Sequence, residues 1–237
     1  KIGVIGYGLI GKAICKLFQD HSRELCATQY QVTSYDSYDT AASFLVHFYN
    51  DYEKAVSDND VIICCTPYHV NKTVAEICVK LGKPYFDLTE DNEKADWIRN
   101  LANKSSTNTL SNISNAKISQ VMPQCGLAPG AVSIIAANMV SFFDSVDTVE
   151  IRVGALPLNT NNEMKYYLSW SPEGLINEYN HPCKEKKNGE LILLQPLEGY
   201  ETVVIDGIEY EAFNTSGGLG TLANTLDKVE NINYKTI

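Results

Sequence analysis

Three glycines near the start of the chain have the spacing of a phosphate-binding loop. A short apolar run, 2–5, leads into Gly6-x-Gly8-x-x-Gly11, and apolar residues at helical spacing follow. The first glycine permits a tight strand-to-helix turn, the second lets a pyrophosphate approach the backbone, and the third lets the helix pack closely on the strand. The start of that helix, with Leu9 and Ile10, offers free N–H groups to phosphate oxygens. The pattern predicts a dinucleotide site.

A carboxylate follows where such sites hold a ribose. The β-branched and aromatic stretch 31–35 predicts a second strand that ends at Asp36, twenty-five residues past Gly11. An acidic side chain there accepts hydrogen bonds from both ribose hydroxyls and repels a 2′-phosphate, which favours NAD over NADP. We include Ser37 in this cofactor site. Two alternatives stay open: Asp36 caps the following turn, or Asp39 takes the ribose role.

Two further predicted strands end in polar residues. The apolar run 61–65 stops at Thr66-Pro67, and the run 85–88 stops at Thr89. In a doubly wound sheet the carboxyl ends of the strands face the cofactor crevice, so Thr66, Pro67 and Thr89 are predicted cofactor contacts. Tyr68, at the same edge, is a predicted substrate contact.

The same edge supplies the candidate catalytic residues. His69 carries an imidazole, the group that most often acts as a general base, and Asp87 could hold an amine or orient water. The alternative for His69 is an exposed residue at the start of a helix. The alternative for Asp87 is an N-cap of the next helix.

Two irregular segments complete the predicted site. The turn Cys125–Gly130 holds two glycines and two prolines, and we expect Cys125 and Gly126 to contact substrate. A thiolate at Cys125 is conceivable, but no His or Lys adjoins it in sequence, so a small residue that fills a tight turn is the better interpretation. Asn214 and Thr215 could hydrogen-bond substrate, or else cap the last helix.

Composition excludes several function classes. The net charge of −10 and the absence of a Lys/Arg cluster argue against nucleic acid. No apolar stretch approaches the length of a membrane span. Seven cysteines without a CxxC pair or a Cys/His metal spacing predict reduced thiols, no metal and a cytoplasmic location. Because residue 1 is Lys and the first strand starts at residue 2, we expect a sequence trimmed at its N-terminus.

The order of elements predicts the fold class. Strands and helices alternate up to residue 130, which is typical of a Rossmann doubly wound parallel sheet. After Val146 short strands dominate, including a predicted strand at 166–170, and Asn188-Gly189 and Asp206-Gly207 predict hairpin turns. We therefore predict a dinucleotide domain at 1–130, an α+β substrate and dimerisation domain at 131–215, and a helix and strand at 216–237 that return toward the first domain.

Several segments together resemble the saccharopine dehydrogenase-like family, and most closely its lysine 6-dehydrogenase type. The resemblance covers nearly the whole chain, and its most specific parts are Cys125–Gly130 and the block Ser171–Tyr179. Further matching segments are Gly6–Gly11, 60–63 with 66–68, 85–88, 153–157, 211–215 and 233–237. The glycine motif alone is common to many dehydrogenases.

The resemblance implies an NAD(P)-dependent oxidoreductase that acts at the C–N bond of an amino acid, with L-lysine as the first substrate. It implies no partner beyond this small molecule and a second copy of the chain, in a homodimer. The alternatives are an NADP-dependent saccharopine reductase or dehydrogenase, and a nucleotide-binding protein without catalysis. The family normally continues beyond the position of Ile237, so we expect a shortened chain.

Overall fold

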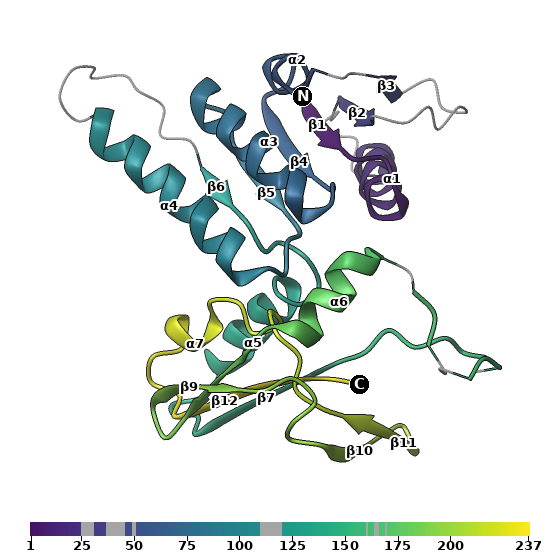
Figure 1. The fold of residues 1–237 in the computed structure, drawn as a ribbon, viewed down its shortest axis with the longest axis vertical. Helices are drawn as coiled ribbons and strands as arrows, with labels where there is room; N and C mark the ends of the chain where they lie inside the picture. The colour runs from purple at the N-terminus through teal and green to yellow at the C-terminus, as the bar shows by residue number, and fades with distance from the viewer. Residues whose placement is uncertain are drawn as a thin grey trace. The chain divides into compact units, whose positions relative to one another are not determined.

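The computed structural model describes two compact units. It covers residues 1–24, 31–36, 46–48, 51–109, 120–159, 161–163, 166–168 and 170–237, with the backbone alone for 21–24, 46–48 and 102–109. Unit 1 comprises 1–89 and 93–123, and unit 2 comprises 90–92 and 124–237 (Figure 1). The predicted Ser37 contact lies outside the described residues.

Unit 1 is built on one parallel sheet. Its strands are β1 (Ile2–Ile5), β2 (Val32–Asp36), β3 (Val46–Phe48), β4 (Val61–Cys64), β5 (Tyr85–Asp87) and β6 (Val121–Met122). They lie in the order β3-β2-β1-β4-β5-β6, and every pair is parallel. This is the doubly wound order with its reversal between β1 and β4, so the predicted fold class is confirmed.

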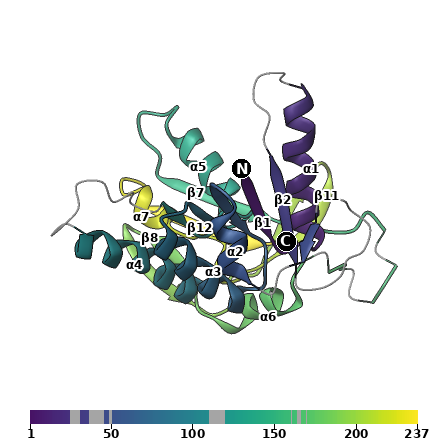
Figure 2. The ribbon, with the colours of Figure 1, turned by 90° about the horizontal axis from the view of Figure 1, so that it is seen from above.

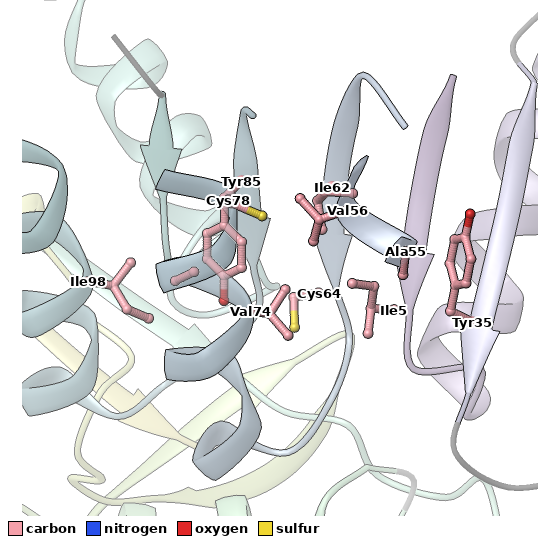
Figure 3. Close-up of a cluster of buried hydrophobic side chains, with 11 residues drawn as sticks. Ile5, Tyr35, Ala55, Val56, Ile62, Cys64, Val74, Cys78, Tyr85 and Ile98 are labelled. Atoms are coloured by element: carbon pink, nitrogen blue, oxygen red, sulfur yellow. The ribbon is translucent and has the colours of Figure 1, made fainter. Parts of the chain in front are cut away.

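Helices cover both faces of this sheet. The helices are α1 (Leu9–Glu24), α2 (Tyr52–Ser57), α3 (Tyr68–Leu81) and α4 (Asn92–Thr109). Cys15 of α1 packs with Val4 and Val32 on one face, where α1 lies apart from the other helices (Figure 2). Figure 3 shows the larger core on the other face, where Val56, Val74 and Ile98 come from the remaining three helices. Alternate residues of β1 therefore serve opposite faces, as in a fully buried strand.

Unit 2 has a separate, mixed sheet. Its strands are β7 (Thr148–Val153), β12 (Asn231–Thr236), β8 (Cys183–Lys187) and β9 (Glu190–Leu194), in that order across the sheet. The last strand, β12, pairs parallel with β7 and antiparallel with β8. Between β9 and β12 in the chain, β10 (Glu201–Ile205) and β11 (Ile208–Ala212) form a separate antiparallel hairpin. No strand pair in the described residues joins the two units into one sheet.

One face of the second sheet is apolar and the other is polar. Ile151, Ile232 and Tyr234 pack with residues of α5 (Ala131–Val140) and α7 (Leu222–Thr225) in the core of unit 2. Arg152 and Lys235 alternate with these residues and instead pair with Glu201 of the hairpin. The third helix of unit 2 is α6 (Pro172–Asn180), which Ser171 caps with its side chain.

Several local predictions hold and others fail. Asn188-Gly189 and Asp206-Gly207 have positive φ at both residues, which confirms the predicted hairpin turns. The predicted strand at 166–170 is wrong, because residues 166–168 have no regular structure and 170 lies in a bend.

The ends of the predicted domains also change. The chain passes from unit 1 to unit 2 after Pro123 rather than after 130, so the Cys125–Gly130 turn belongs to unit 2. Residues 216–237 belong to unit 2, because β12 fills the position between β7 and β8 in its sheet. None of the helices in the described segments is both long and apolar enough to span a bilayer.

Candidate functional site

The glycine-rich loop of unit 1 has the geometry that a pyrophosphate needs. Gly6 has φ +93°, and a Cβ on it would lie 2.8 Å from the carbonyl of Cys65. A Cβ on Gly11 would lie 1.9 Å from the oxygen of Gly6, so α1 approaches the loop closely only because this residue is glycine. Around Gly8, by contrast, a Cβ would meet no atom within 4 Å. The first turn of α1 carries no acidic residue.

Asp36 is fixed against this loop. Its Oδ2 accepts a hydrogen bond of 2.7 Å from the backbone N–H of Tyr7. The backbone N–H of Gly6 donates to the Tyr35 carbonyl at 2.8 Å, which ties the end of β1 to the end of β2. A carboxylate has acceptor capacity beyond one hydrogen bond, so Asp36 retains the ability to accept from the hydroxyls of a sugar.

The carboxyl ends of β4 and β5 hold a buried polar network. The Thr66 hydroxyl donates to Asn71 Oδ1 at 2.9 Å, and the Cys64 thiol lies 3.1 Å from that hydroxyl. The Tyr85 hydroxyl donates to Asp87 Oδ2 at 2.7 Å, and the Thr89 N–H donates to Asp87 Oδ1 at 2.9 Å. Asp87 is fully buried, and these donors hold its carboxylate as part of the strand edge.

Two titratable side chains of this network are held in their neutral forms. Burial raises the pKa of the Cys64 thiol to about 11, although hydrogen bonds with Thr66 act in the opposite direction. Burial raises the pKa of the Tyr85 hydroxyl above its ordinary value, and its hydrogen bond to Asp87 acts in the same direction. Tyr85 is therefore a donor to Asp87 across the physiological range, and Cys64 is not a nucleophile.

The predicted residues at the start of α3 are more accessible. His69 is exposed and meets the Tyr68 ring edge-on, with 6.1 Å between the ring centroids. Tyr68 also lies under the ammonium of Lys94, 4.3 Å from its ring centroid. Pro67 precedes the helix as its N-terminal cap residue and is exposed. Thr66 and Thr89 lie at the carboxyl ends of β4 and β5, where contacts to a cofactor were predicted.

In unit 2, the predicted 125–130 turn is closely folded. Gly126 and Gly130 form a β-bridge, and the Ala131 N–H donates to the Gly126 carbonyl at 2.9 Å. Gly130 has φ +138°, and a Cβ on it would lie 2.2 Å from the oxygen of Gly126. The turn therefore requires a glycine at residue 130, and Cys125 is half-buried within it.

The 171–179 block and the 214–220 segment meet at Glu90. A Cβ on Gly174 of α6 would lie 2.8 Å from Glu90 Oε1, and a Cβ on Gly217 would lie 2.5 Å from the Glu90 carbonyl oxygen. The Ser216 N–H donates to the carbonyl of Glu178 at 2.9 Å, so the 214–220 segment is bound to α6 directly. The same segment packs on the 125–130 turn, where a Cβ on Gly220 would lie 2.8 Å from Pro129.

The carboxyl group of Glu178 in this cluster has a strongly raised pKa. Burial and the negative charge of Glu90 raise its pKa to about 8, although a hydrogen bond with Thr215 acts in the opposite direction. The Thr215 hydroxyl in turn lies 2.6 Å from the hydroxyl of Thr236 on β12. A carboxyl group with this pKa exchanges its proton near neutral pH, which general acid–base chemistry requires.

The two predicted substrate residues of unit 2 differ in their surroundings. Thr215 belongs to the Glu178 cluster. Asn214 is also buried, but its side chain contacts Gly199, and a Cβ there would lie 3.0 Å from Asn214 Nδ2. Neither residue caps α7, whose N-terminal cap residue is Thr221 without a side-chain hydrogen bond.

Sequence reasoning did not single out Glu178 as a functional residue. It lies on the helical block that carries the family resemblance, but an acidic residue on a short helix is usually a solvated one. The sequence feature that could have pointed to it is the presence of glycines at 174, 217 and 220, because such glycines allow segments of backbone to pack closely against other residues. In the part of the chain that the structure describes, no group of three or more His, Cys, Asp or Glu residues could hold a metal ion.

The sheet order, the glycine loop and the fixed Asp36 define a Rossmann-type dinucleotide-binding protein. Comparison with known families agrees, because residues 1–85 match the model for NADP oxidoreductase coenzyme F420-dependent and residues 126–237 match the saccharopine dehydrogenase C-terminal domain. The saccharopine dehydrogenase (L-Glu forming) of Saccharomyces cerevisiae has a similar fold, with a TM-score of 0.67 over 99% of this chain at 16% identity.

Curated relatives are similar in sequence. Over 63% of this chain, it is 26% identical to an alpha-aminoadipic semialdehyde synthase of Arabidopsis thaliana and to a saccharopine dehydrogenase [NADP(+), L-glutamate-forming] of Schizosaccharomyces pombe. Together these matches indicate a saccharopine dehydrogenase-like family and confirm the predicted resemblance. The matches cover only 13% and 32% of these two relatives, and 54% of the S. cerevisiae chain.

Proposed function

We propose that the chain is a nicotinamide-dinucleotide-dependent oxidoreductase that acts at the C–N bond of an amino acid. The observation that carries the proposal is the cluster around Glu178. Three segments that resemble the family meet there around a carboxyl group that titrates near neutral pH. Unit 1 contributes a loop that fits a dinucleotide.

The residues that would hold the cofactor are those of the glycine loop and the adjoining strand ends. The backbone at Gly6–Gly11 would bind the pyrophosphate, Asp36 the ribose, and Thr66 and Thr89 would line the strand edge. The cofactor, when bound, supplies the acceptor or donor of a hydride. We propose NAD rather than NADP, because the carboxylate of Asp36, held by the Tyr7 N–H, would repel a 2′-phosphate.

The protein must keep the reacting amine neutral. A hydride leaves the carbon that bears nitrogen only when the nitrogen lone pair is free to form the C=N bond. An alkyl ammonium ion has a pKa of about 10.4, so a neighbouring group has to accept its proton. We assign this proton to Glu178, with Thr215 orienting the carboxyl group. We propose a positioning role for Asp87, because Tyr85 and Thr89 hold its buried carboxylate.

The substrate that we propose first is saccharopine, a secondary amine that joins two amino acids. This choice is supported by the S. pombe relative, which is a saccharopine dehydrogenase. L-Lysine, oxidised at its side-chain amine, is the second candidate, because the 125–130 turn and the 171–179 block resemble the lysine 6-dehydrogenase type. His69 remains a candidate proton carrier at the start of α3, where it is exposed.

The test follows reduced cofactor in the presence of saccharopine, L-lysine, L-alanine or L-glutamate, with NAD or NADP. Turnover of saccharopine above the other three supports the first choice, and turnover of lysine supports the second. Glu178→Gln should lower kcat and remove the rise of kcat at alkaline pH. Glu173→Gln, a control on the same helix, should leave both unchanged. A protein that binds NAD but converts none of these substrates would favour the non-catalytic alternative.

Cofactor choice is tested separately by titration of both dinucleotides. Asp36→Ser should weaken the binding of NAD about 10-fold to 100-fold, because a hydrogen bond to a charged group contributes about 1.5–3 kcal/mol. The same change should reduce the preference for NAD over NADP. Asp58→Ser, which changes an exposed carboxylate at the end of α2, is the matched control. Tighter binding of NADP than NAD by the unmodified protein would reject the role given to Asp36.

A further inference from the structure

A cavity lies on the polar side of unit 2. It has a volume of about 520 Å³, and its lining comes from β8, β9, β12 and the segment between β9 and β10. The lining residues are Glu185, Leu194, Glu198, Gly199, Asn214, Asn233 and Lys235. The volume falls in the range of about 300–1,000 Å³ that small-molecule sites have.

One wall of this cavity contains a buried donor without an acceptor. Asn214 is 2% exposed, and within the described residues its Nδ2 has no hydrogen-bond partner. A buried amide that lacks a partner is costly, and native proteins keep few of them. The backbone of Asn214 is fully used, since its N–H donates to Glu198 and its carbonyl accepts from Leu197. The side chain is therefore the part that is available for a ligand acceptor.

The segment over Asn214 has an unusual backbone. Leu197 has φ +67°, a left-handed conformation that a leucine rarely adopts, and it is 59% exposed. Such strain is retained where the surrounding contacts impose it, and it is frequent at binding sites. Here the contacts are the two backbone hydrogen bonds to Asn214 and the bond from the Gln195 N–H to Glu198 Oε2.

The charges in the cavity select the ligand class. Glu185 and Glu198 bring two carboxylates, and Lys235 brings an ammonium that already pairs with Glu201. In the described part of the chain, the side chain of Glu185 makes no hydrogen bond or ion pair. The two carboxylates would repel a simple anion, and a simple cation would offer no acceptor to the Asn214 amide. A zwitterion meets both requirements, because its carboxylate can lie toward Asn214 and Lys235 while its ammonium lies toward the glutamates.

We propose that this cavity binds the α-amino and α-carboxylate groups of a free amino acid. The proposal goes beyond the reaction, because the cavity is made entirely of unit 2 residues and needs no dinucleotide. The bound amino acid is either the substrate or an effector of the same chemistry. The experiment distinguishes these two sources.

The test is calorimetric titration of the cofactor-free chain with L-glutamate and L-lysine. The matched probes are N-acetyl-L-glutamate, which lacks the ammonium, and L-glutamine amide, which lacks both carboxylates. We expect at least one free amino acid to bind, and each blocked probe to bind about tenfold more weakly or worse. Failure of both amino acids to bind, or equal binding of the blocked probes, would overturn the proposal.

Variants locate the binding in this cavity. Glu185→Gln and Asn214→Ala should each weaken the amino acid about tenfold. Glu190→Gln, which changes an exposed carboxylate on β9, should leave its affinity unchanged. Glu185→Gln alters a partly exposed side chain, so it serves as the second variant if Asn214→Ala does not fold. Unchanged binding in the Glu185 variant would place the ligand elsewhere and reject the site.

The source of the ligand follows from kinetics. If the KM of the amino acid rises in parallel with its dissociation constant in Glu185→Gln, the cavity holds the substrate. If an added amino acid changes the rate on another substrate, and this response disappears in Glu185→Gln, the cavity holds an effector. The binding measurement stands by itself, so a chain that binds the amino acid without turnover would reject the proposed reaction and keep the site.

Discussion

The carboxyl group of Glu178 should make unit 2 less stable as the pH rises through neutrality. Its pKa is raised from its ordinary value of 4.5 to about 8, first by burial and then by the charge of Glu90. Between these two values the folded chain holds a proton that the unfolded chain has released, so the free energy of unfolding falls with increasing pH. Each pH unit in that window contributes up to about 1.4 kcal/mol, and the whole window roughly 4–5 kcal/mol at most.

The measurement uses one tryptophan in each unit. Trp97 lies in unit 1 and Trp170 lies in unit 2 beside Gly174, and the chain has two tryptophans in all. In a Trp97→Phe background, urea unfolding monitored by tryptophan fluorescence between pH 5 and pH 9 reports on unit 2 alone.

Glu178→Gln should remove most of the pH dependence, because the amide does not titrate, whereas the exposed Glu173→Gln should keep it. A stability that is flat or rises from pH 5 to pH 8, or an unchanged slope in Glu178→Gln, would refute the assignment of a neutral, partly buried carboxyl group.

Two further changes test the loop and the hairpin. Gly11→Ala should weaken dinucleotide binding at least tenfold in titrations, because its Cβ would lie 1.9 Å from the Gly6 oxygen, and normal binding would contradict the predicted close approach. Glu201→Gln should lower the free energy of unfolding by about 1–3 kcal/mol, because Arg152 and Lys235 lose a charged partner. The control is Glu209→Gln, which changes an exposed residue of the same hairpin and should leave the free energy of unfolding in urea unchanged. If Glu201→Gln and Glu209→Gln changed this free energy equally, the ion pairs of Glu201 would contribute nothing.

The fold of unit 1 was predictable because its signals are local. Gly6, Gly8 and Gly11 fix the strand-to-helix turn, and continuous apolar runs such as 61–64 are typical of strands buried on both faces. The hairpin turns of unit 2 were predictable for the same reason, since Asn-Gly and Asp-Gly tolerate positive φ at both positions.

The contacts between distant segments were not predictable. The three-residue β3 carries too few residues for a periodic signal, and Tyr166–Leu168 are aromatic and apolar enough to be mistaken for a strand. Nothing in the sequence around Glu90 indicates that residues 90–92, which follow β5 of the first sheet, belong to unit 2. The perturbed Glu178 depends on that contact, so it became visible only when the chain was folded.

The position of β12 has a consequence for synthesis on the ribosome. The sheet of unit 1 has all its described strands once residue 122 has been made, because β1 to β6 follow one another in the chain without a strand of unit 2 between them. The second sheet cannot join β7 to β8 until Asn231–Thr236 has been made, 83 residues after β7 begins, because β12 lies between them. Loop closure over such separations is slow, and it leaves strand edges exposed meanwhile. During translation, the edges of β7 and β8 that later pair with β12 therefore stay unpaired until β12 has been made. Chaperones that bind unpaired strand edges have their longest opportunity at this stage.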